Sequence, residues 1–159
     1  MKLVKKGEDE VIFWLHPKEH AALMLVVEHY PVLKEDYQTL THSQDPKIAE
    51  AARELLRQSL AEQKAENLRF KQTFLQAGQH LKKMGRGYHL LLKPQEMERL
   101  LQVLNDVRVG LWHALDCPDL GNPEVLSKAS ASQLEKFWTM ELAGSLEWNL
   151  IELLEQLGY

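Results

Sequence analysis

The sequence predicts a mainly helical fold, a bundle of four main helices with a small β element. Long segments rich in Ala, Leu, Glu, Gln and Lys are typical of helices, and two of them start with proline directly after a short apolar run. The 159 residues are 45% hydrophobic and 26% charged, close to the average of globular domains. We therefore expect residues 1–159 to form a single helical domain.

An N-terminal hairpin is expected over about residues 2–15. Its two segments flank the turn-forming trio Gly7-Glu8-Asp9, and residues 11–15 are β-branched or aromatic. A buried helix then follows from Pro17, which suits the first helical position, to Tyr30, where Pro31 stops it.

The longest predicted helix runs from the cap at Asp45 and Pro46 to about Leu81. Its first half carries an apolar stripe of Ile48, Ala52, Leu55, Leu56 and Leu60. Polar residues between 63 and 67 dilute this stripe, so we expect the middle of the helix to be exposed. Lys82, Lys83 and Arg86 then form a basic cluster that complements the dipole of a helix C-terminus.

A short third strand, about residues 87–92, leads into a second helix that begins with proline, from Pro94 to about Leu115. The segment 13–19 followed by Leu23 matches the segment 90–96 followed by Leu100 at the same spacing, which indicates two strand-to-helix units. The final helix is expected from a capping box of Ser132 and Glu135 to Leu157.

Charge and cysteine content limit the classes of partner and compartment. The net charge is -4 and the pI is about 6.0, which makes nucleic acid an unlikely partner and gives no attraction to anionic lipid. Cys117 is the single cysteine, and no apolar run is long enough to span a membrane or to form a secretory signal. A cytoplasmic protein is expected.

No catalytic motif comes with the context that its chemistry requires, so no catalytic residue and no cofactor is predicted. The Gly-rich phosphate loops and the serine-hydrolase elbow are absent. His16-Pro17-Lys18-Glu19-His20 does match the string of inverted zinc peptidases. Because Pro17 makes His16 a cap outside the helix, the two imidazoles need not share a face. A metal-dependent hydrolase using His16, Glu19 and His20 is the alternative interpretation.

Charged residues fall where helical periodicity places the core. Arg108 lies within the apolar stripe of its helix, and a guanidinium there requires an acceptor within reach. On the last helix, acidic residues lie on the face that Trp138, Leu142 and Trp148 define as apolar. The sequence therefore predicts a partly buried polar cluster, either a structural ion pair or a pocket for a charged group, made of Arg108, Glu141, Glu152, Glu19, Trp112 and Trp138.

The segment Leu101 to Leu111, with its Leu-Asn-Asp-x-Arg core at 104–108, resembles an uncharacterised bacterial family, a domain of unknown function often encoded beside the protease adaptor ClpS. The run from Pro17 to Leu23 and the leucines at 142 and 146 are also similar to that family. The N-terminal hairpin and Trp112 depart from its pattern. The resemblance implies a small helical protein with a link to Clp-type regulated proteolysis.

The interpretation that these observations favour is a non-enzymatic binding or adaptor module. It would use helix grooves, or the diluted face at 63–67, to bind a protein partner, Clp protease components among them, or to self-associate. A weaker alternative is a regulator that contacts nucleic acid through Lys82, Lys83 and Arg86, with binding that falls steeply as salt rises.

Overall fold

The computed structural model describes residues 1–32, 46–119 and 123–158, and it is mainly α with a minor β part, as predicted. The elements in chain order are β1 (Lys2–Lys6), β2 (Val11–Leu15), α1 (Pro17–His29), α2 (Pro46–Phe74), β3 (Leu81–Met84), β4 (Gly87–Leu92), α3 (Pro94–Ala114), α4 (Pro123–Ser127) and α5 (Ala131–Leu157). The predicted cap at Asp45 lies outside the described residues.

The strands form one antiparallel sheet in the order β1-β2-β4-β3. The predicted hairpin and the third strand are confirmed as β1, β2 and β4. The fourth strand, β3, replaces what was predicted as the end of the long helix. That helix stops at Phe74, and Gly78 supplies the left-handed φ of 81° in the turn that follows. The prediction of a helical basic end is therefore wrong, because Lys82 and Lys83 lie on an edge strand.

A hairpin followed by a helix occurs twice in the fold. The units β1-β2-α1 and β3-β4-α3 meet where β2 pairs with β4, in a register that sets Val11 opposite Leu92 and Leu15 opposite Tyr88. The predicted pair of strand-to-helix units is thereby confirmed. The N3 glutamates also match: Glu19 Oε2 accepts the His16 backbone N–H at 2.7 Å, and Glu96 Oε2 accepts that of Lys93 at 2.8 Å.

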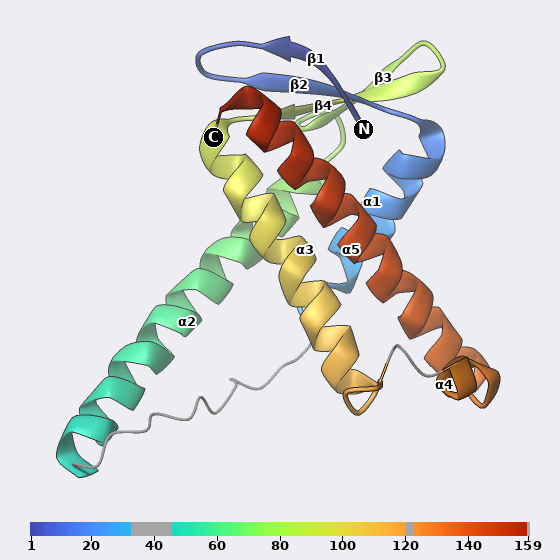
Figure 1. Ribbon diagram of the computed structural model, residues 1–159. Helices are drawn as coiled ribbons and strands as arrows, with labels where there is room; N and C mark the ends of the chain where they lie inside the picture. Colours follow the sequence, from blue (N-terminus) through green and yellow to red (C-terminus); the bar gives the residue numbers. More distant parts are fainter. Residues whose placement is uncertain (33–45, 120–122, 159) are drawn as a thin grey trace.

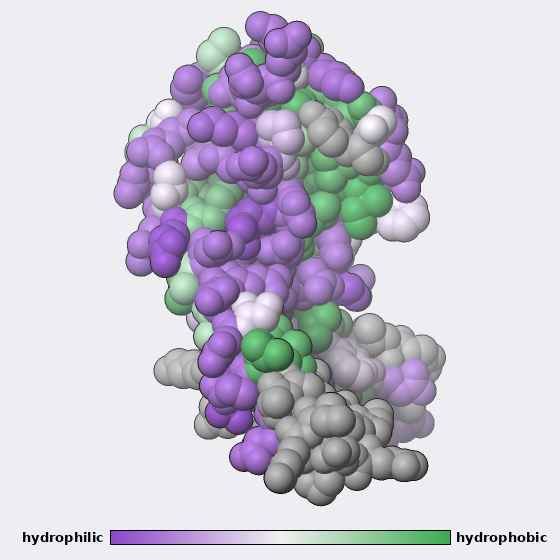
Figure 2. Space-filling model, turned by 90° about the vertical axis from the view of Figure 1, so that its left-hand side faces the viewer, coloured by the Kyte–Doolittle hydropathy of each residue, from purple (hydrophilic) through white to green (hydrophobic). Residues whose placement is uncertain are grey.

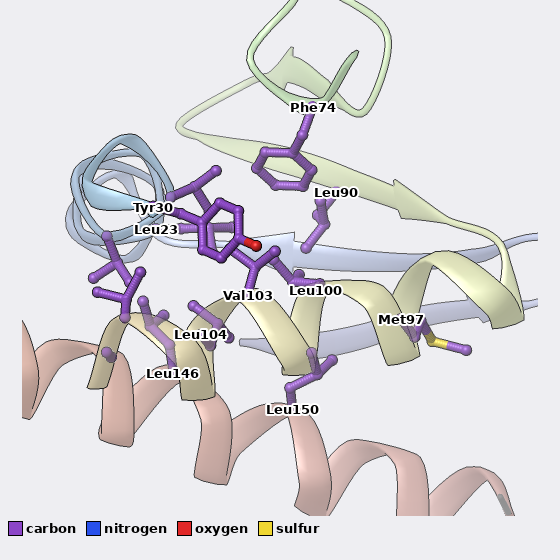
Figure 3. Packing of buried hydrophobic residues seen from close by; sticks show 14 of the residues in the cluster. Leu23, Tyr30, Phe74, Leu90, Met97, Leu100, Val103, Leu104, Leu146 and Leu150 are labelled. Atoms are coloured by element: carbon purple, nitrogen blue, oxygen red, sulfur yellow. The ribbon is translucent and has the colours of Figure 1, made fainter. Parts of the chain in front are cut away.

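All the long helices lie on one side of the sheet, and the first half of α2 extends away from the others (Figure 1). The core lies between the sheet, α1, α3 and α5, and α2 adds Phe70 and Phe74. Figure 3 shows Leu23 of α1, Tyr30 directly after that helix, Leu90 of β4 and a row of α3 side chains meeting Leu146 and Leu150 of α5. Burial of these apolar side chains is the main force that holds α3 against α5.

The face of α5 that packs inward differs from the predicted one. The buried positions are Phe137, Thr139, Met140, Ala143, Leu146, Leu150, Leu153 and Leu157, whereas Trp138 and Trp148 are 69% and 63% exposed. Both sides of this helix are rich in apolar residues, so its periodicity does not identify the core side. Its capping box also lies two residues earlier than predicted, at Ser130 and Gln133.

Candidate binding site

Arg108 lies on α3, the helix that packs against α5, and its guanidinium forms an ion pair with Glu147. Its Nε donates to Glu147 Oε2 at 2.9 Å, and its NH2 donates to Asn105 Oδ1 at the same distance. The Arg108 side chain is 45% exposed and that of Glu147 is 16% exposed. The predicted acceptor on the last helix thus exists, but it is Glu147 and not Glu141. The reason is that α5 packs inward with a different face from the one that was predicted.

A groove of about 390 Å³ opens beside this ion pair. Its walls come from α3 and α5: Arg108, Val109, Trp112, Met140, Glu141 and Gly144. Three of the six predicted cluster residues, Arg108, Trp112 and Glu141, therefore do line one site. Gly144 keeps the groove open, since a Cβ there would lie 3.3 Å from Arg108 Cδ.

One side of the groove is acidic and aromatic and is exposed to solvent, because Glu141 and nearby tryptophans lie there. Glu141 is exposed, and within the described residues it makes no ion pair. Trp112 donates its indole N–H to the Pro118 carbonyl at 3.2 Å, which fixes the ring at the rim. Trp138 does not line the groove, but it lies three residues before Glu141 on α5, so the two side chains are neighbours on the helix surface.

The exposed side of α5 continues this surface along the helix. Trp138, Glu141, Ser145, Trp148 and Glu152 are all exposed and recur at intervals of three and four residues, so they share one face. We call these five residues the α5 stripe. Glu152, a predicted member of the Arg108 cluster, lies on this solvent-facing stripe, and the ion pair of Arg108 is with Glu147.

Glu19 lies at the start of α1 and takes no part in the Arg108 site. Its carboxylate accepts from the Met1 ammonium and from the His16 backbone N–H. Burial alone would raise the pKa of Glu19, but these two donors outweigh it and hold the pKa below the usual 4.5.

The histidines of the candidate zinc string have other contacts. His16 is the N-cap of α1, and its Nδ1 accepts the Lys18 backbone N–H at 3.2 Å. The His20 ring stacks on Tyr88 with centroids 3.7 Å apart, and burial lowers its pKa. Across the described ranges, no group of three His, Cys, Asp or Glu side chains is placed to hold a metal ion. His113 lies 3.5 Å from the Cys117 sulfur, a neighbour the sequence did not indicate.

A second polar cluster, which sequence reasoning missed, joins α2 to α3. Asn67 was expected on an exposed face but is fully buried, and its Oδ1 accepts from Arg99 at 3.3 Å. Its Nδ2 makes no hydrogen bond to any of the described residues. Burial raises the pKa of Asp106, which the nearby Asn67 amide and the Lys64 ammonium offset only in part. The sequence did contain a signal for this cluster, because Asp106 belongs to the Leu-Asn-Asp-x-Arg core at 104–108.

Comparison with known proteins places the chain in a family. No helix in the described part of the chain has the length and apolar content to cross a membrane. No curated protein and no solved structure is significantly similar to the chain. A family model described as a domain of unknown function (DUF2017) matches residues 7–157. This match covers β2, the Arg108 site and the α5 stripe but not β1, and the chain belongs to the DUF2017 family.

Proposed function

We propose that the chain is a non-enzymatic binding or adaptor module and that the groove between α3 and α5 takes a cationic segment of a protein partner. The observation that carries this proposal is the division of charge at the groove. Glu147 already neutralises Arg108 and Asn105 accepts a further hydrogen bond from it, so Glu141 is the acid at the groove that is left open to a partner.

The aromatic residues support the same kind of partner. Tryptophan faces attract lysine and arginine side chains, and large exposed apolar side chains gathered on one surface are typical of protein interaction sites. Trp112 lies at the groove, and Trp138 and Trp148 extend the surface along α5. The groove is large enough for one or two side chains of a docked peptide, with the α5 stripe beside it.

The expected biological setting is Clp-type regulated proteolysis, through ClpS or the Clp ATPase that it serves. The resemblance at residues 101–111 supports this part of the proposal. Self-association through the same groove is a second way in which the surface could be used. The metal-hydrolase alternative gains no support from the geometry, because His16 caps a helix and His20 stacks on Tyr88.

The test is a binding titration of the purified chain against ClpS and against the Clp ATPase, with Glu141→Lys as the main variant. Reversing this charge puts a cation where the partner's cation would lie, so the dissociation constant should rise at least tenfold. Glu98→Lys, an exposed reversal on α3 outside the groove, is the matched control and should change it by less than a factor of two.

Two outcomes would overturn the proposal. One is that neither Clp component binds and that the chain also stays monomeric at high concentration. The other is equal weakening of a bound partner by Glu141→Lys and by Glu98→Lys. Circular dichroism of both variants shows that the fold is retained.

A further inference from the structure

The four strands carry cations and no anions, in a chain whose net charge is negative. No Asp or Glu occurs in β1, β2, β3 or β4, and the two edge strands hold five lysines: Lys2, Lys5, Lys6, Lys82 and Lys83. The net charge of -4 therefore hides an uneven distribution. The pI alone disfavours a polyanionic partner, but it does not describe this surface.

The register aligns one row of side chains across all four strands. Lys2 lies opposite Trp14, Trp14 opposite His89, and His89 opposite Lys82. Directly opposed residues point to the same side of a sheet. Phe13 and Leu90, adjacent in sequence to members of this row, are fully buried on the helix side. The row Lys2-Trp14-His89-Lys82 therefore lies on the outer face, away from the helices (Figure 1).

Trp14 packs against the sheet beside Gly87. A Cβ at Gly87 would lie 2.6 Å from Trp14 Nε1, so the indole packs directly over the glycine backbone. The ring is only partly exposed, and Ile12 and Leu91 form the next opposed pair beside it. Viewed from the side of α2, the surface around the sheet at the top is mostly hydrophilic (Figure 2).

The acidic turn of the first hairpin lies away from this row. Val11 pairs with Leu92 and Leu15 pairs with Tyr88, so the β1-β2 turn and the β3-β4 turn lie at opposite ends of the sheet. The acidic residues at 8–10 are thus at one end, while Arg86 adds its charge at the end where the row lies. Glu19, the nearest acid on α1, is neutralised by the Met1 ammonium.

We propose that the outer face of the sheet binds single-stranded nucleic acid, with a base stacked on Trp14 and backbone phosphates on Lys2 and Lys82. Neighbouring strands are about 4.8 Å apart, so the two lysines stand about 14 Å apart with the aromatic rings between them. A flat aromatic between cations is the arrangement by which sheet surfaces hold unpaired bases. A protein or lipid partner would use the charges but would not require the aromatic ring.

The experiment measures fluorescence anisotropy of a labelled twelve-nucleotide single strand titrated with the full chain. Trp14→Leu should weaken binding about tenfold, within the range for loss of one stacked base, whereas Trp14→Phe should retain most of it. The double variant Lys2→Glu and Lys82→Glu should abolish measurable binding. Because Trp14 is partly buried, thermal denaturation must show that each variant is folded.

The controls lie on other surfaces. Trp138→Leu removes a more exposed tryptophan, and Lys128→Glu reverses an exposed lysine on the opposite part of the molecule, so neither should change the affinity by more than twofold. Glu141→Lys should also leave it unchanged, which separates this inference from the proposed function.

Three results would overturn the inference. The first is absence of binding at low salt. The second is equal loss with Trp14→Leu and Trp138→Leu. The third is binding to vesicles of anionic lipid that is at least as tight as binding to the oligonucleotide and is weakened by the same lysine reversals, which would identify the face as a lipid-binding surface.

Discussion

At the scale of single residues, two helical glycines differ in what surrounds them. A Cβ at Gly110 of α3 would lie 2.8 Å from the Val32 Cβ, whereas a Cβ at Gly144 of α5 would meet only Arg108 Cδ at 3.3 Å. The first neighbour is a stiff β-branched side chain next to the backbone, and the second is part of a long side chain that is almost half exposed.

Gly110→Ala should therefore destabilise the protein by about 1–3 kcal/mol, the usual cost of forcing an extra carbon into a packed site. Gly144→Ala should be neutral or stabilising by up to about 1 kcal/mol, because alanine is the better helix former and Arg108 can move aside. Urea denaturation of both variants measures the difference. Equal effects of the two substitutions would show that the close contact at Val32 does not constrain α3.

Asp106 gives a pH-dependent prediction. Burial raises the pKa of this carboxyl, so its ionised form is disfavoured in the folded state. A carboxyl group with a raised pKa lowers stability above that pKa and ceases to do so once it is protonated. Asp106→Asn should therefore raise the midpoint of thermal denaturation at pH 7, and the gain should shrink as the pH falls through the raised pKa and be absent below the ordinary value of 3.8. Glu98→Gln, exposed on the same helix, should show no such trend.

A lower midpoint of Asp106→Asn at pH 7 would mean that the ionised carboxylate is favoured by its neighbours more than burial disfavours it. That result would direct attention to Asn67 and Lys64, the two groups that lower the pKa of Asp106.

Single-residue features of the candidate site could be predicted only in part from the sequence. Periodicity identified Arg108 as a cation on an apolar stripe, and the need for an acceptor on the last helix is confirmed by Glu147. The identity of that acceptor depends on the rotation of α5 about its axis, which two apolar faces leave undetermined. Burial of Asn67 depends on the docking of α2, a tertiary contact with no local signal.

At the scale of elements, the start of α1 depends on the Glu19 carboxylate, which contacts both the N-terminal ammonium and the first turn of the helix. Glu19 stands at N3 of α1 and binds both the Met1 ammonium and the His16 backbone N–H. It thereby joins β1 to the first turn of the helix and offsets one of the unpaired N–H groups at the helix start.

Glu19→Gln should destabilise the fold by up to about 1 kcal/mol at pH 7, because glutamine can still accept the His16 N–H but cannot form the ion pair with the Met1 ammonium. The pKa of Glu19 is lower in the folded state than its usual 4.5, so its contribution is complete above that pH and is lost as the pH falls through the folded value. The stability difference between the two proteins should therefore be nearly constant from pH 7 to pH 6, where the α-ammonium keeps its charge, and should vanish in stronger acid. Guanidinium denaturation over a pH series measures it, and a difference independent of pH would contradict the role of the charge.

Helix starts were predictable where proline marks them. Pro17, Pro46 and Pro94 each begin a helix as expected. The end of α2 was placed about seven residues too late, because residues 75–81 contain good helix formers and the pairing of β3 with β4 is a nonlocal contact. Local propensity favours a helix there, and the free edge of β4 favours a strand.

At the scale of the whole molecule, the fold class and the repeated strand-to-helix unit were predictable, but the surfaces were not. The short match between residues 13–19 and 90–96 corresponds to two hairpin-helix units paired through β2 and β4. The sequence does not show that this pairing gathers the lysines on one side of the molecule. It also does not show that the tryptophans of α5 remain in solvent, at a distance from that basic face.

The pairing of the two units at β2 and β4 also has a consequence for the rate at which the chain folds. Each hairpin closes within a few residues, whereas Val11 and Leu92 are about 80 residues apart along the chain. Closing that larger loop costs about 2.5 kcal/mol more in chain entropy than closing a short turn. We therefore expect the hairpins and the helices to form early, and the joining of the two halves at the centre of the sheet to set the height of the folding barrier.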